Sequence, residues 1–217
     1  MIVAIDGPAG AGKSTASRAV AQALGFAHMD TGAMYRAVTL AALRDGLDIG
    51  DRASLDAFVA SMDVSLDDNS LTIDGTDVTS RLRSAEVTQA VARVASQPQV
   101  RAALVPLQRR LAQRRDIVVE GRDIGTVVFP DAEIKVYLTA SPTERALRRT
   151  RQLGLDEDTD TIEEMAADIH SRDTTDATRE VSPLQQAHGS RLIDSSDMTL
   201  DEVVAAIVAL VEQDGGS

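Results

Sequence analysis

The 217-residue sequence contains no cysteine and no tryptophan. The absence of cysteine excludes disulfide bonds, thiolate metal sites and a cysteine nucleophile. Aromatic residues make up only 2% of the chain, so its core must be built from Ala, Val, Leu and Ile, which suits helices packed on a parallel sheet. No run of about eighteen apolar residues occurs, and no basic segment followed by an apolar run stands at the start. We therefore expect a soluble cytoplasmic protein without a membrane partner.

Positive charge is also scarce. The chain has 22 Lys and Arg against 34 Asp and Glu, which gives a formal net charge of -12. This balance argues against a nucleic acid partner, so a small anionic ligand would need a local basic site. Lys13 and Lys135 are the only lysines in the chain. Because lysine is so rare, Lys13 is a candidate for a specific role.

A glycine-rich segment follows the apolar run Ile2 to Ile5 directly, and its residues are Gly7, Pro8, Ala9, Gly10, Ala11, Gly12, Lys13, Ser14 and Thr15. This spacing is that of a P-loop, in which backbone N–H groups and a helix N-terminus surround nucleotide phosphates. Lys13 can place its charge on the β and γ phosphates, and the Ser14 hydroxyl suits a largely hydrated Mg²⁺. A glycine-rich turn that merely caps a helix is the alternative. The scarcity of lysine favours nucleotide binding.

Short apolar runs predict five buried strands, over residues 2–5, 27–29, 117–119, 134–138 and 191–193. Capping boxes that begin at Ser141, Thr161 and Thr199 predict intervening helices over 142–152, 162–172 and 200–213. Alternation of strands and helices implies an α/β fold, a five-stranded parallel sheet flanked by helices. Ligands then bind at the carboxyl ends of the strands.

Residues 63–83 depart from this alternation of strands and helices, because apolar and polar residues alternate there around two turn signals. We predict a small antiparallel insert, with a long surface loop as the alternative. Ser84, and then Ser96 with Pro98, are predicted to begin two further helices, the second of which runs to about Arg114. The chain is thus expected to form a single domain with a core of 1–62, 84–150 and 187–217, and with a mobile lid over 151–186.

Charged residues concentrate where the predicted strands end. Thr31 could cap a helix that directs Tyr35 and Arg36 into a cleft, the alternative being a plain cap with an exposed Arg36. Arg122 and Asp123 lie between two glycines after the third strand. The guanidinium suits bidentate phosphate recognition and the carboxylate can accept from an exocyclic amine, whereas a structural ion pair is the alternative.

Arginines also cluster further along the chain. Helical spacing places Arg145, Arg148 and Arg149 on one face, with Arg151 following, and this positive charge suggests a bound anion. The segment 172–179 is predicted to end a helix and open a polar loop, and mobile arginine-bearing loops can exclude water from phosphoryl transfer. The histidines, including His28, have no metal-ligand spacing and are assigned no catalytic role.

At these residues the chain resembles the bacterial cytidylate kinases, P-loop nucleoside monophosphate kinases that phosphorylate CMP and dCMP with ATP. The resemblance covers essentially the full length and rests on the P-loop with its preceding Asp6, on 30–36, on 121–132 and on 172–179. It implies that ATP and Mg²⁺ are the cofactors and CMP and dCMP the substrates. The insert at 63–83 matches the small sheet of this family's monophosphate-binding region.

The resemblance also implies roles for single residues. Those that match acceptor-nucleotide positions are Thr31, Tyr35, Arg36, Arg101, Arg122, Asp123, Arg172, Asp176 and Arg179. Among them the family uses Arg36, Arg122 and Arg179 for the phosphate, with Thr31 and Tyr35 beside it. Positions matching Arg101 and Asp123 read cytosine, and those matching Arg172 and Asp176 contact the ribose. Two positions depart from the pattern of some relatives, which have serine in place of Ala92 and aspartate in place of Glu120.

Catalysis of this kind needs no covalent intermediate, because alignment and charge neutralisation suffice when the transition state is loose. We expect Lys13, Arg122, Arg179 and Arg148 to supply that neutralisation together with Mg²⁺, in a monomer. A regulatory GTPase would need an Asn-Lys-x-Asp motif, and a nucleic acid remodelling ATPase a basic surface, and the sequence has neither. A kinase for AMP, UMP or a non-nucleotide alcohol stays open.

Overall fold

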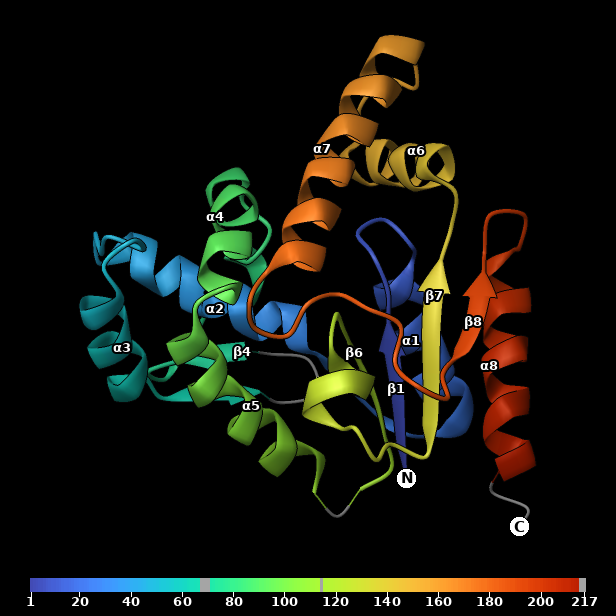
Figure 1. Ribbon diagram of the computed structural model, residues 1–217, viewed down its shortest axis with the longest axis horizontal. Coiled ribbons are helices and arrows are strands. Elements are labelled where there is room, and N and C mark those ends of the chain that lie inside the picture. The colour runs from blue at the N-terminus through green and yellow to red at the C-terminus, as the bar shows by residue number, and fades with distance from the viewer. Residues whose placement is uncertain (67–70, 114, 215–217) are drawn as a thin grey trace. The chain divides into compact units, whose positions relative to one another are not determined.

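The computed structural model describes residues 1–66, 71–113 and 115–214. Its elements are β1 (Ile2–Asp6), α1 (Lys13–Leu24), β2 (Ala27–Asp30), α2 (Thr31–Arg44), α3 (Arg52–Ser61), β3 (Val64–Leu66), β4 (Leu71–Ile73), β5 (Thr76–Asp77), a 3₁₀ turn (Thr79–Arg81), α4 (Ala85–Ala95), α5 (Pro98–Ala112), β6 (Ile117–Gly121), a π-helical turn (Ile124–Val128), β7 (Ile134–Thr139), α6 (Pro142–Leu153), α7 (Thr159–Thr178), β8 (Arg191–Asp194) and α8 (Leu200–Asp214) (Figure 1).

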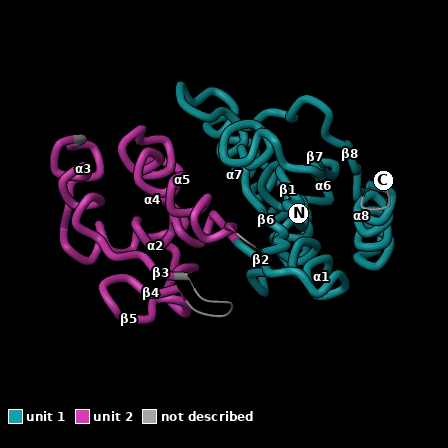
Figure 2. Tube along the Cα trace, turned by 90° about the horizontal axis from the view of Figure 1, so that it is seen from below, with its two compact units in different colours: residues 1–29, 115–217 teal, residues 30–114 magenta. Residues whose placement is uncertain are grey.

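The chain divides into two compact units (Figure 2). The first unit consists of Met1–Met29 and Arg115–Ser217, and the second of Asp30–Arg114. The first contains most of the large sheet with the P-loop, and the second contains the small sheet with α2 to α5. Each unit is described by itself below.

The large sheet has the strand order β2-β6-β1-β7-β8. Strand β1 pairs in parallel with β6 and β7, and β7 pairs in parallel with β8. The prediction of a five-stranded parallel sheet is thus confirmed. Every strand runs one or two residues beyond the predicted apolar run and ends on Asp6, Asp30, Gly121, Thr139 or Asp194. The carboxyl ends of β1, β6, β7 and β8 meet at one edge, so polar residues gather there.

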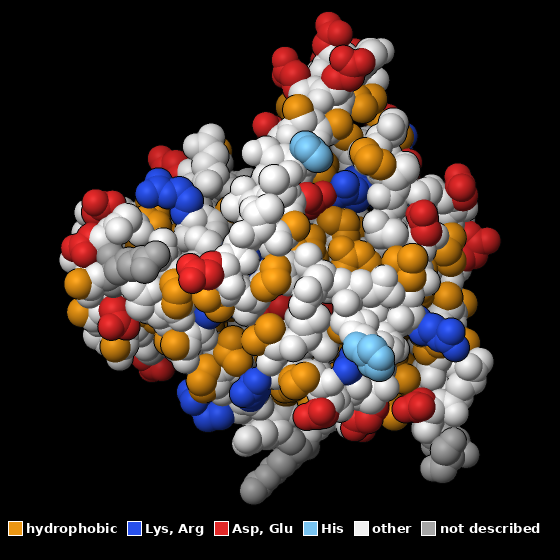
Figure 3. Space-filling model, viewed as in Figure 1, with side chains coloured by type: hydrophobic (Ala, Val, Ile, Leu, Met, Phe, Trp, Pro, Cys, Tyr) orange, Lys and Arg blue, Asp and Glu red, His pale blue; other side chains and the backbone are white. Residues whose placement is uncertain are grey.

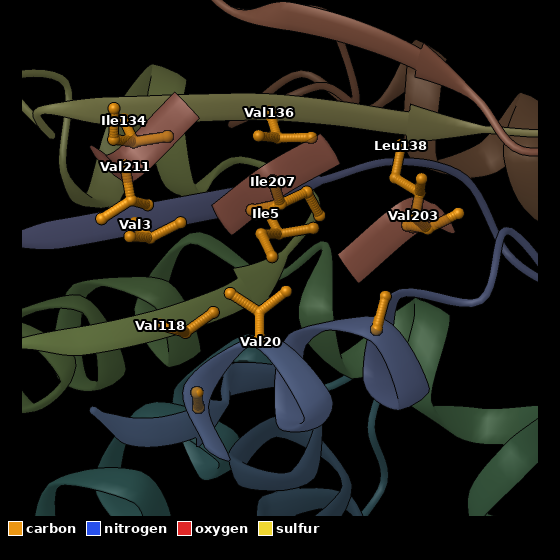
Figure 4. Packing of buried hydrophobic residues seen from close by; sticks show 12 residues of the cluster. Val3, Ile5, Val20, Val118, Ile134, Val136, Leu138, Val203, Ile207 and Val211 are labelled. Atoms are coloured by element: carbon orange, nitrogen blue, oxygen red, sulfur yellow. The ribbon is translucent and has the colours of Figure 1, made fainter. Parts of the chain in front are cut away.

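Aliphatic residues fill the core of the first unit, as the lack of aromatics required. Figure 4 shows Ile5 of β1 and Val136 of β7 facing Val20 of α1 and Ile207 of α8, so α1 and α8 cover the same face of the sheet. Ile5 and Ile207 have no exposed surface. Burial of such side chains, at about 25 cal/mol per Å² of apolar surface, stabilises the frame on which the P-loop is held.

The second unit contains the small sheet that residues 63–83 were expected to form. Strands β3, β4 and β5 pair antiparallel in sequence order, which confirms the insert. The first turn signal, residues 67–70, lies outside the described residues, and so does Arg114 at the expected end of α5. Helix α2 packs against β4 and α4, and α3 packs against α5.

Several predicted helix starts were wrong by one to three residues. Asp30, rather than Thr31, caps α2, because its carboxylate accepts the N–H of Ala33 at 3.0 Å. Helix α5 follows Gln97, whereas the predicted cap Ser96 ends α4. Helix α7 begins after Asp158, whose Oδ1 accepts the N–H of the predicted cap, Thr161, at 2.9 Å. At α2 and α7 an aspartate caps the helix in place of the predicted threonine, because a carboxylate also interacts favourably with the positive end of the helix dipole.

Helix α7 is also longer than predicted, and the polar loop expected over 172–179 is wrong. The helix continues to Thr178, so most of this segment forms its last two turns. The hydroxyls of Thr174, Thr175 and Thr178 donate to the carbonyls four residues earlier at 2.7–3.0 Å, which accommodates polar residues in the helix. At the opposite, outer end of α7 acidic side chains gather (Figure 3), where they complement the helix N-terminus.

Within the described residues, no helix is both long enough and apolar enough to cross a bilayer.

Candidate functional site

The glycine-rich segment connects β1 to α1 at the carboxyl edge of the sheet. Gly12 adopts a left-handed conformation (φ 87°) immediately before the first helical residue, Lys13. Asp6, the last residue of β1, accepts the N–H groups of Ile124 and Gly125 at 2.8 and 2.7 Å. Burial raises the pKa of Asp6 to about 6, although these two hydrogen bonds oppose the shift. The P-loop and the turn after β6 are therefore held together by one buried carboxyl group.

Gly7 has no room for a side chain. A Cβ atom at this position would lie 2.0 Å from the carbonyl oxygen of Leu138 in β7. Since both partners are backbone, the overlap could be relieved only by moving the loop or the strand. Glycine is thus required for the loop to leave β1 at this angle.

We expect Gly7→Ala to reduce the free energy of unfolding by about 3 kcal/mol, at the upper end of the range for overpacking in a dense interior. Gly25→Ala is the matched control, because Gly25 also has a positive φ, 67°, but no atom within 4 Å of its added Cβ. That variant should lose only the ~1 kcal/mol of left-handed strain. Urea unfolding of both variants measures the difference; equal losses would contradict the overlap with Leu138.

Lys13 lies folded over its own loop. Its side chain is buried, with 7% exposed, and Nζ donates to the carbonyl of Pro8 at 2.7 Å. Burial lowers the pKa of Lys13 to about 7, and the positive charge of Arg122 adds to the effect. The amine is therefore poised to gain a proton when anionic groups enter the loop.

A buried carboxylate, Glu120, lies beneath the start of α1. Its Oε2 accepts the hydroxyl of Ser14 at 2.7 Å, and its Oε1 lies 3.1 Å from Ser17 Oγ and 3.2 Å from His28 Nε2. Burial raises the pKa of Glu120, but the hydrogen bonds from His28 and Ser14 and the charge of Lys13 outweigh burial, so the pKa lies below its usual range. Sequence reasoning gave His28 no role. Only the placement of β2 next to β6 reveals this contact.

Two arginines and two aspartates alternate in a charged network on the first unit. Arg122 Nε donates to Asp176 Oδ2 at 2.9 Å. Arg179 lies 3.7 Å from both Asp123 and Asp176, and its Nε donates to the Ser182 carbonyl. The side chains of Arg179 and Asp123 are only 5% and 6% exposed. The sequence-predicted residues Arg122, Asp123, Asp176 and Arg179 are thus brought together, and Arg172 lies half-buried on the same helix as Asp176.

The arginines of α6 each bind an acceptor of the chain itself. Arg148 donates to Glu144, and to the hydroxyl and carbonyl of Ser195 at 2.9 and 2.6 Å. Arg149 donates to Gln152, and Arg151 to Glu157. Arg145 binds the P-loop and α7, as described below. These four side chains therefore do not form one open basic patch.

The second unit contains the remaining predicted site residues. Thr31 is buried at the start of α2, and Arg36 Nη1 lies 3.7 Å from Asp30 Oδ2. Tyr35 is buried too, and the guanidinium of Arg101 lies 5.3 Å from the centroid of its ring, within cation–π range. Arg101 is only 3% exposed, and its Nη1 donates to the Ala95 carbonyl at 3.3 Å. Helices α2 and α5 thus hold Tyr35 and Arg101 as a pair.

Similarity to known proteins shows the family of this chain. A model of the cytidylate kinase family matches residues 3–213. The chain belongs to the cytidylate kinase family. The cytidylate kinase of Mycobacterium leprae is 47% identical over 218 residues, covering 100% of this chain and 98% of that protein. The cytidylate kinase of Pelotomaculum thermopropionicum is 48% identical over 214 residues, covering 96% and 95%.

Among solved structures, an uncharacterized protein from Eubacterium ventriosum superimposes with a TM-score of 0.54 at 12% identity, over 98% of both chains. This likeness concerns the fold alone. Membership of the cytidylate kinase family, in contrast, rests on sequence identity over nearly the whole chain. It makes the chain a nucleotide-binding phosphotransferase of the nucleoside monophosphate kinases.

Proposed function

We propose that the protein transfers the γ-phosphoryl group of ATP to the phosphate of CMP and dCMP, forming CDP and dCDP, by direct in-line transfer. The observation that carries the proposal is the presence, in one unit, of a P-loop with a buried Lys13 and of the Arg122–Asp123–Asp176–Arg179 network. The loop suits the donor triphosphate, and the network offers guanidinium groups for a second phosphate. The names of the relatives supply cytidylate as the acceptor.

The residues present fit ATP with Mg²⁺. The P-loop offers backbone N–H groups around a helix N-terminus, and a Cβ in place of Gly7 or Gly10 would meet backbone carbonyl oxygens at 2.0 and 2.8 Å. In the described part of the chain, no group of three or more His, Asp or Glu side chains could hold a metal ion. This suits Mg²⁺, which keeps several waters and takes only one or two protein oxygens. Bound Mg²⁺ would neutralise charge that develops on the transferred group.

We assign the Ser14 hydroxyl as the protein ligand of Mg²⁺, and Glu120 orients this hydroxyl by accepting its hydrogen bond. Lys13, on leaving the Pro8 carbonyl, would bind the β and γ phosphates of the donor. Arg122 and Arg179 would hold the acceptor phosphate together with Arg36, and Arg148 would stabilise charge on the donor side. Such preorganised donors would stabilise the negative charge of the transition state, and direct transfer needs no protein nucleophile.

We further propose that residues 151–186 form a lid over the reacting phosphates, that the base is read by Arg101 and Asp123, and that Arg172 and Asp176 hold the ribose. Thr31 and Tyr35 would border the acceptor phosphate. The protein would act in the cytoplasm as a monomer. These assignments follow the residue types that the family uses at the matching positions.

A coupled assay of ADP formation with ATP against CMP, dCMP, UMP, AMP and dTMP tests the proposed function. CMP and dCMP should give the highest kcat/KM. A preference for AMP, UMP or dTMP would identify a different monophosphate kinase, and the absence of ADP formation with every acceptor would contradict a monophosphate kinase altogether.

Asp123→Ala tests whether the Asp123 carboxylate distinguishes cytosine from uracil. If the carboxylate accepts the exocyclic amine of cytosine, its loss should lower kcat/KM for CMP by roughly tenfold more than for UMP, since a site built to hydrogen-bond one group loses that selectivity when the partner is removed. Specificity constants for both nucleotides measure this, with the exposed Asp168→Asn as control. An equal loss for CMP and UMP would reject base reading by Asp123.

Nucleotide binding should be accompanied by proton uptake. The pKa of Lys13 is lowered to about 7, so near pH 8 the free amine is mostly neutral, and the phosphates of ATP would raise its pKa and protonate it. Uptake should therefore approach one proton at pH 8 and vanish at pH 6, where the amine already carries its proton. Calorimetric titration of ATP in two buffers of different ionisation enthalpy measures it. Lys13→Met should abolish the buffer dependence; its persistence would assign the uptake to another group.

A further inference from the structure

Ala9 of the P-loop is bound through both of its backbone polar groups by residues that the proposed mechanism does not use. The N–H of Ala9 donates to Asp173 Oδ1 at 3.1 Å, and the carbonyl of Ala9 accepts Arg145 Nη1 at 3.0 Å. The same Nη1 donates to Asp173 Oδ2, which completes an ion pair. Three segments therefore meet at this point: the P-loop, α6 through Arg145, and α7 through Asp173.

The packing around this junction is close. The side chain of Ala9 lies against the buried Ala146 of α6 and Ile169 of α7. A Cβ at the neighbouring Gly10 (φ 75°) would lie 2.8 Å from the Arg145 carbonyl oxygen, so the backbone of α6 rests directly on the loop. The side chains of Arg145 and Asp173 are only 10% and 18% exposed. Because little solvent surrounds this ion pair, removing or displacing one partner would leave the other charge poorly hydrated.

The junction is joined to the charged network by one turn of α7. Asp173 and Asp176 are three residues apart in that helix, a spacing that puts them on the same side. Asp176 accepts from Arg122 and lies next to Arg179. A movement of the Ala9 backbone can thus reach the residues proposed to hold the ribose and the acceptor phosphate through one rigid turn of α7.

We infer that Asp173 is a positioning residue which, held by Arg145, couples the donor site to the acceptor site; this inference rests on the proposed function. Its carboxylate occupies a backbone donor of a loop that is built to bind anions. A polyphosphate in that loop acts on the carboxylate through its charge and through the backbone of Ala9, and α7 transmits the change to Asp176. Because coupling free energy is reciprocal, CMP must change the affinity for the donor by the same factor.

The dissociation constant of CMP, measured by calorimetry with and without a non-hydrolysable ATP analogue and Mg²⁺, tests the inference. In the unaltered protein the two values should differ by at least about fivefold, the lower end of typical allosteric couplings. Asp173→Asn, which removes the charge but keeps the size, should bring the ratio below about twofold on the same scale. Asp168→Asn, the same change at an exposed position of α7, should leave the ratio unaltered.

Arg145→Lys is the second variant, because it keeps the charge but loses the fork that binds Ala9 and Asp173 together, and it should also reduce the ratio. Thermal unfolding identifies any variant that does not fold, in which case the other decides. An unchanged ratio in a folded Asp173 or Arg145 variant overturns the inference, as does a ratio of one in the unaltered protein. If the unaltered protein neither binds nor phosphorylates CMP, the proposed function fails instead.

Discussion

Replacing Lys13 by alanine is expected to lower kcat for CMP phosphorylation by roughly a hundredfold or more, the size typical of removing a preorganised electrostatic donor. Lys13 is the only lysine of the P-loop, and the other lysine of the chain, Lys135, belongs to β7 and donates to the Pro130 carbonyl. No second amine is available to replace it. In steady-state kinetics with ATP saturating and CMP varied, kcat should fall by a much larger factor than the KM for CMP rises.

The stability of this variant should move little. A buried amine whose pKa has fallen to about 7 is held in the folded state at a cost, so its removal should leave the melting temperature unchanged or slightly raised. Lys135→Ala is the matched control and should retain normal turnover. A Lys13→Ala enzyme with near-normal kcat would remove Lys13 from the proposed mechanism.

Much of this architecture could be predicted from the sequence because the strands are short, buried and apolar. All five predicted runs are strands, and the glycine spacing located the P-loop. The ends of the helices were harder, since several Asp and Thr residues compete for each cap. The choice of Asp158 over Thr161 depends on which side chain reaches a free N–H. The threonines near the end of α7 led to the prediction of a loop, because composition does not reveal the hydrogen bonds from their hydroxyls to preceding carbonyls.

The site shows the same limit. The family resemblance placed Arg122, Asp123, Asp176 and Arg179 in one acceptor site, but the ion pairs between the turn after β6 and the end of α7 arise only in the folded chain. His28 was missed because its partner, Glu120, lies 92 residues away. The arginines of α6 were expected to bind an anion together. In the structure each donates to an acceptor of the chain, which could not be predicted because helical spacing fixes the face of a side chain and not its partner.

Arg179→Ala is expected to lower kcat/KM for CMP by roughly a hundredfold, within the several kcal/mol that follow from truncating one member of a buried charge pair. Arg179 lies 3.7 Å from both Asp123 and Asp176. Without it, two carboxylates share the single charge of Arg122, and the acceptor phosphate loses a bidentate donor while meeting more negative charge.

The loss caused by Arg179→Ala should be confined to the kinetic constants for the acceptor, CMP. The KM for ATP should change by less than about threefold, because the proposed donor contacts come from the P-loop and α6. A loss of similar size for ATP and for CMP would indicate general distortion. Arg179→Lys, which keeps the charge but not the fork, should recover only part of the activity. Arg191→Ala, at an exposed position of β8, is the control. Adding Asp176→Asn to Arg179→Ala should restore part of the CMP affinity by removing one of the two carboxylates that then share the charge of Arg122. Failure of that partial rescue, with the single variant still inactive, would mean that Arg179 acts on the phosphate alone and not by balancing Asp176.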